Sequence, residues 1–126
     1  MNKHYSLQRS IITTTFAVSM LWCVKSFEIL YYADLSWMGL KPLDLAGALG
    51  ILTAPLVHGS LEHIFNNTLP LLILGSVLLY GYPESRWRVV SLVWIFSGIG
   101  VWLFAREANH IGASGLSHGL FFFLFV

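Results

Sequence analysis

The sequence is poor in charge. Only 10% of its 126 residues are Asp, Glu, Lys or Arg, whereas a soluble domain usually carries about a quarter. Apolar side chains make up 56% of the chain, which leaves too little polar surface to cover one short soluble domain. A lipid bilayer solvates such side chains, so the composition predicts an integral membrane protein.

Cysteine is nearly absent. Cys23 is the one cysteine, so neither an internal disulfide nor a cysteine pair that binds a metal is expected. We interpret Cys23 as a small buried apolar residue. The formal net charge of +1 indicates neither nucleic acid nor an acidic partner. The sequence implies no metal ion and no organic cofactor.

Long apolar runs are present instead. They predict spanning helices over residues 10–31, 61–80 and 89–104, and a fourth that begins near Ser114 and is still apolar at Val126. The fourth is too short to cross a bilayer, and a free carboxylate inside hydrocarbon is costly. We therefore expect the N-terminal part of a longer protein, with about two more helices beyond Val126.

The connections between these segments differ in length. Residues 33–60 contain an apolar stretch, residues 49–57, which Pro55 interrupts and which is too short to span. We expect an interfacial or re-entrant loop there. Residues 81–88 and 105–111 are predicted to be short polar connections.

Basic residues lie unevenly between the two sides of the predicted membrane. Four fall on one side and two on the other: Lys3, Arg9, Arg86 and Arg88 against Lys41 and Arg106. This asymmetry predicts a cytoplasmic N-terminus. No small-residue cleavage site follows the first apolar run, which we interpret as a retained helix rather than a signal peptide.

Polar residues gather where the second span begins, in His58-Gly-Ser-Leu-Glu-His63-Ile-Phe-Asn66-Asn67. Ser60 is expected to cap this helix. His63 and Asn67 are four residues apart and share a helical face, while Asn66 points about 100° away. Such residues inside a membrane indicate a functional site or interhelical hydrogen bonds that hold a bundle together.

A second polar motif, Gly112-Ala113-Ser114-Gly115, opens the fourth segment. Glycines allow a substrate backbone to approach closely, and a helix N-terminus offers free amides and a positive dipole end to a developing oxyanion. The alternative is a small-residue helix contact in which Ser114 is a plain N-cap.

Together, the two motifs resemble the rhomboid family of intramembrane serine proteases, in order and in spacing, over roughly residues 39–119. The resemblance implies that Ser114 is the nucleophile. His63 and Asn67 would donate to the tetrahedral oxyanion, with help from the Ser114 amide. His58 would support the opening of the site and its water supply, and the site would be supported by Gly112 and Gly115.

The chain departs from the family pattern in its general base. The family places a histidine in a sixth helix, and this chain has no fifth or sixth helix. A serine hydroxyl is a poor nucleophile without a base, so we expect the 126-residue chain to be inactive as it stands. One substitute is His118, which is expected to lean toward Ser114; otherwise it packs between helices.

Other titratable residues have simpler interpretations. Lys25 and Glu28 are expected to pair with each other or to reach the interface, with a role in a substrate channel as the alternative. His4 and His110 are expected to be exposed, and His110 stands close enough to the serine loop to affect access.

The prediction is therefore one all-α domain over residues 1–126, a polytopic rhomboid-like helical bundle with about four transmembrane helices. By resemblance it is a serine endopeptidase of the bacterial inner membrane that cleaves transmembrane protein substrates within the lipid bilayer. Two alternatives stay open: a non-catalytic rhomboid-like protein that binds transmembrane helices, and an unrelated transporter or scaffold. The sequence does not indicate an oligomeric state.

Overall fold

The computed structural model describes residues 6–126, and its regular elements there are helical, apart from one β-bridge between Leu40 and His110. The predictions about Lys3 and His4 lie outside the described residues. In chain order the elements are α1 (Leu7–Tyr31), η1 (Ser36–Met38), η2 (Gly47–Leu49), α2 (Gly50–Thr53), η3 (Ala54–Leu56), α3 (Leu61–Gly81), α4 (Arg86–Phe104) and α5 (Ser114–Phe125).

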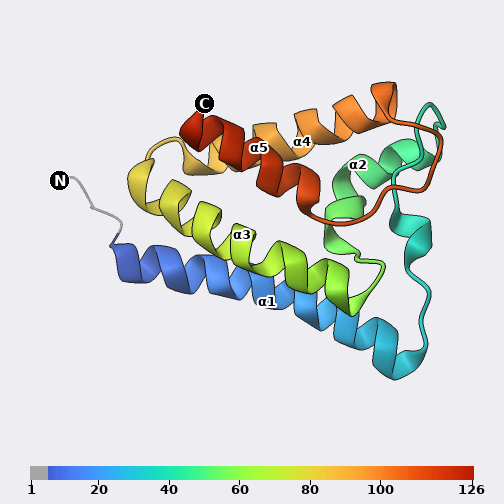
Figure 1. The fold of residues 1–126 in the computed structure, drawn as a ribbon, viewed down its shortest axis with the longest axis horizontal. Coiled ribbons are helices and arrows are strands. Elements are labelled where there is room, and N and C mark those ends of the chain that lie inside the picture. Colours follow the sequence, from blue (N-terminus) through green and yellow to red (C-terminus); the bar gives the residue numbers. More distant parts are fainter. Residues whose placement is uncertain (1–5) are drawn as a thin grey trace.

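α3 lies at the centre of the arrangement. It packs against α1 on one side and against α5 on the other, and α5 also packs against α4 (Figure 1). One buried cluster, formed by Leu74, Leu78, Val89 and Leu120, joins α3, α4 and α5. A second cluster, formed by Val18, Leu71 and Ala113, joins α1 and α3 to the start of α5. The start and the middle of α5 are thus anchored to α3.

The contact between α1 and α3 is close because Gly75 has no side chain. A Cβ atom at this position would lie 2.7 Å from Thr14 Cγ2 on α1. Nearby, Trp22 Nε1 donates to Thr68 Oγ1 at 3.0 Å. Small residues and interhelical hydrogen bonds are the usual means by which helices associate in lipid.

Three described helices, α1, α3 and α4, are long and apolar enough to cross a membrane. The all-α membrane bundle predicted from the sequence is confirmed. α5 begins at Ser114 as predicted, but it has 12 residues and is shorter than a span. The apolar stretch before α3 forms the short helices from Gly47 to Leu56.

Two sequence predictions about residues of the spanning helices are corrected. Cys23 is exposed rather than buried, because it lies on a face of α1 that points away from α3 and would meet lipid. Arg86 and Arg88, predicted to lie in a connection, belong to the first turn of α4. Hydropathy places a helix end where apolar residues end, whereas a helix continues into polar residues at the interface.

Candidate functional site

The start of α3 carries the first group of polar residues. Ser60 caps the helix: its hydroxyl accepts from the His63 backbone N–H at 3.0 Å, as the sequence predicts. His58, two residues earlier, lies beside the first turn of the helix. The His58 and His63 rings meet edge to face with their centroids 5.1 Å apart.

His58 is the most enclosed polar side chain of this group, with 1% of its surface exposed. Its Nε2 accepts from the Ala113 backbone N–H at 3.3 Å, so the neutral ring carries its proton on Nδ1. His58 lies in the loop before α3, outside the spanning helices. Burial, with help from the neighbouring His63 and Lys25, lowers the pKa of His58 from 6.5 to about 4.

The loop before α5 approaches His63 at Gly112. This glycine has a φ of +103°, a conformation that side-chain-bearing residues rarely adopt. A Cβ atom here would lie 2.5 Å from His63 Cε1 and 2.6 Å from its Nε2. The Gly112 N–H donates to the Ala54 carbonyl at 2.9 Å. Only glycine therefore lets the serine loop lie against the histidine ring.

Asn67 lies one turn further along α3 than His63. It is 6% exposed, and its Nδ2 has no hydrogen-bond partner among the described residues. An amide buried without a partner is costly and calls for an explanation. The neighbouring Asn66 is exposed, so the two asparagines point to different surroundings, as their spacing predicts.

Ser114 is the first residue of α5, where helix amides have no partner within the helix. It lines a cavity of about 240 Å³ between α2, α4 and α5, together with Gly112, Gly115, Ser97 and His118. His63 and Asn67 do not line this cavity. The serine loop therefore has His58 and His63 on one side and this cavity on another.

His118 leans toward Ser114, but its contact is with the backbone. Its Nδ1 lies 2.6 Å from the Ser114 carbonyl oxygen, and a carbonyl only accepts, so this nitrogen donates. The Ser117 hydroxyl donates to the same oxygen at 2.9 Å. These bonds satisfy a carbonyl of α5 and do not engage the serine hydroxyl.

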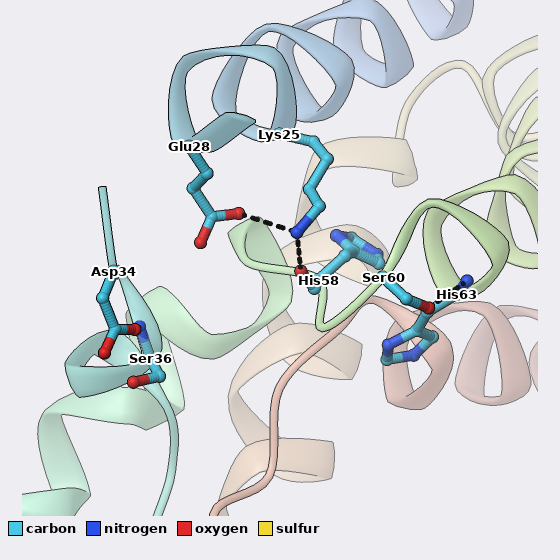
Figure 2. A network of polar contacts seen from close by, with 7 residues as sticks. All are labelled: Lys25, Glu28, Asp34, Ser36, His58, Ser60 and His63. Atoms are coloured by element: carbon cyan, nitrogen blue, oxygen red, sulfur yellow. Dashed lines mark hydrogen bonds and ion pairs between the residues drawn. The ribbon is translucent and has the colours of Figure 1, made fainter. Parts of the chain in front are cut away.

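Lys25 and Glu28 pair as the sequence predicts, with Nζ and Oε2 3.4 Å apart. Figure 2 shows a second contact that the sequence did not predict: Lys25 Nζ also donates to the His58 carbonyl at 3.0 Å. Lys25 and His58 are 33 positions apart. Sequence spacing predicts only contacts within one helix, so this bond becomes evident only from the way α1 packs beside the start of α3.

His110 is half-buried rather than exposed. Its backbone exchanges two hydrogen bonds of 2.8 Å with Leu40, and its ring Nε2 lies 3.0 Å from the Arg106 carbonyl. The serine loop is thereby tied to the loop that follows α1. His110 also lines the cavity beside Ser114.

Comparison with known proteins gives one family and several relatives. The family model described as Rhomboid domain matches residues 46–126, a range that contains both polar motifs. An uncharacterised protein of Mycobacterium tuberculosis (strain H37Rv) is 36% identical over 116 residues, which cover 86% of this chain and 48% of that protein. One of Mycobacterium leprae (strain TN) is 34% identical over 122 residues, covering 91% and 48%. No solved structure gives a significant match. The chain spans about half the length of the curated relatives it matches.

Proposed function

This chain belongs to the rhomboid family, and from that premise we propose that it carries the nucleophile and oxyanion site of an intramembrane serine endopeptidase. The reaction would be hydrolysis of a peptide bond in or beside a transmembrane segment of a substrate protein. One observation carries the proposal: the serine loop is held against the start of α3, with Ala113 donating to His58 and Gly112 against His63.

Each residue has a proposed role. Ser114 Oγ attacks the scissile carbonyl carbon, and the carbonyl oxygen becomes the oxyanion. The donors are the His63 ring, Asn67 Nδ2 and the Ser114 backbone amide at the helix start. The unpartnered, buried Asn67 amide supports this assignment, because a donor kept for the transition state has no partner in the resting site.

The general base is proposed to approach Ser114 from the cavity of about 240 Å³. The α3 side of the serine loop is occupied by His58 and His63, whereas the cavity leaves open space beside the serine. His118 remains the substitute base within this chain. Its Nδ1 donates to a carbonyl, so it would have to act through Nε2 or after rotating its ring.

The proposed setting is a bacterial inner membrane with the N-terminus in the cytoplasm. The proposed partners are transmembrane protein substrates and the surrounding lipid. Arg9, Arg86 and Arg88 support this orientation, since they lie at the end of the bundle where α1 and α4 begin and α3 ends (Figure 1).

The proposal is tested by following cleavage of a single-span reporter protein in lipid vesicles, using the protein as its host produces it. We expect cleavage by the wild type and a loss of about 10³-fold or more in the Ser114→Ala variant, which lacks the nucleophile. Equal cleavage by both proteins would overturn the assignment of Ser114.

The second candidate is a non-catalytic rhomboid-like protein that binds transmembrane helices. The contact of His118 with a backbone carbonyl favours it, because the histidine nearest to Ser114 along the helix is then not placed as a base. It predicts that the reporter crosslinks to the protein without being cut, and equally well in the Ser114→Ala variant.

A further inference from the structure

An ion pair lies in the last two turns of the first spanning helix, α1. The side chains of Lys25 and Glu28 are 13% and 11% exposed, and the pair joins Nζ to Oε2 at 3.4 Å. Charged groups within transmembrane helices are costly and usually serve a function. The stability gained from a buried pair seldom explains its presence, since desolvation offsets most of the attraction.

The pair is connected to the serine loop by hydrogen bonds. Lys25 Nζ donates to the His58 carbonyl at 3.0 Å (Figure 2). The ring of the same His58 accepts from the Ala113 backbone N–H at 3.3 Å. Ala113 directly precedes Ser114, so two hydrogen bonds lead from α1, through His58, to the residue beside the nucleophile.

We propose that Lys25, oriented by Glu28, is a positioning residue that fixes His58 and thereby the loop that carries Ser114. The inference rests on the proposed function for its catalytic consequence, though not for the positioning itself. Lys25 fixes the backbone of His58 from one side while the ring holds Ala113 on the other. Glu28 directs the ammonium group and compensates its charge where little water is present.

The positive charge of Lys25 also favours the hydrogen bond between the His58 ring and the Ala113 N–H. A positive charge near His58 opposes protonation of its ring, and the pKa of His58 is lowered to about 4 by burial, His63 and Lys25. Only a neutral ring accepts the Ala113 N–H at Nε2. The ammonium group thus helps to preserve the bond that holds the serine loop.

The test compares Lys25→Met with Trp22→Phe. Lys25→Met keeps an unbranched side chain but removes the ammonium donor. Trp22→Phe removes a 3.0 Å hydrogen bond from α1 to Thr68 on α3, which is separate from the path through His58, and it keeps an aromatic ring against the cluster that contains Ala113. Backbone hydrogen exchange over residues 110–118 is measured by mass spectrometry on the protein as its host produces it.

We expect faster exchange in the serine loop of Lys25→Met and wild-type exchange in Trp22→Phe. The rate of labelling by a serine-directed fluorophosphonate is expected to fall about tenfold in Lys25→Met. In Lys25→Arg, which keeps a cationic donor, labelling should stay within about threefold of the wild type. A merely structural role predicts no such rescue by Lys25→Arg. It also predicts that Lys25→Met and Trp22→Phe each lose labelling in proportion to their loss of thermal stability.

The outcomes separate the two proposals. Unlabelled wild type with faster loop exchange in Lys25→Met would refute the protease proposal and support the positioning. Unchanged loop exchange in Lys25→Met would overturn the positioning whatever the labelling. If Lys25→Met does not fold, Glu28→Gln gives the same test, because it keeps the shape and removes only the charge that orients Lys25.

Discussion

Replacing Gly112 by alanine tests the geometry on which the candidate site depends. The added methyl group acts in two ways. It forces a residue with a Cβ to hold a φ of +103°, and it places that Cβ 2.5 Å from His63 Cε1. Either the loop or the histidine ring must then move.

The size of the effect follows from these values. Holding a non-glycine residue in such a backbone conformation costs about 1–3 kcal/mol. Carbon atoms make favourable contacts at about 3.5–4.0 Å, so the ring and the loop must separate by about 1 Å. A misplacement of that size costs up to about 10²-fold in rate. Gly112→Ala should therefore lose rate far beyond what its loss of stability explains.

The assay is the fluorophosphonate labelling rate, with the thermal unfolding midpoint measured in parallel. Gly100→Ala is the matched control, because a Cβ there meets no atom within 4 Å. Replacing a helical glycine by alanine should also raise stability by about 0.5–1 kcal/mol. Wild-type labelling and an unchanged midpoint in Gly112→Ala would refute the close approach of the serine loop to His63.

Three other perturbations test the site and its scaffold. Asn67→Ala and His63→Ala should each slow fluorophosphonate labelling by about 10²–10³-fold, and a loss below twofold in both would exclude them as oxyanion donors. His58 has a folded pKa of about 4 against an ordinary 6.5, so the unfolded chain takes up the proton first as pH falls. Its contribution to stability is present above pH 6.5 and is lost between pH 6.5 and about 4. The thermal midpoint should fall across that window in the wild type and less in His58→Asn; parallel curves would contradict a neutral buried ring. Gly75→Val should lower stability by about 1–3 kcal/mol by meeting Thr14, and wild-type stability would show that α1 and α3 do not pack as closely as described.

The sequence predicts the elements well where local chemistry determines them. Ser60 precedes an apolar run and caps α3, and Ser114 follows small residues and begins α5. The start of α3 is thus set by a side-chain cap, whereas α5 begins at Ser114 after Ala113, with no side-chain cap. The start of α4 was missed because Arg86 and Arg88 are polar, and hydropathy does not distinguish a polar first turn from a loop.

Contacts between distant segments cannot be predicted from local sequence. The bond from Lys25 to the His58 carbonyl depends on how α1 crosses α3. The pairing of Leu40 with His110 depends on where two loops meet. His118 was expected to lean toward Ser114 and does so, but whether it reaches the hydroxyl or the carbonyl is decided by a rotamer, which spacing does not specify.

The most direct test of the central claim is to map the fluorophosphonate adduct by peptide mass spectrometry on the protein as its host produces it. We expect a single adduct on Ser114 Oγ, which does not form in heat-denatured protein and forms more slowly in Asn67→Ala. An adduct on another serine, or no adduct in folded protein that cleaves the reporter, would contradict it.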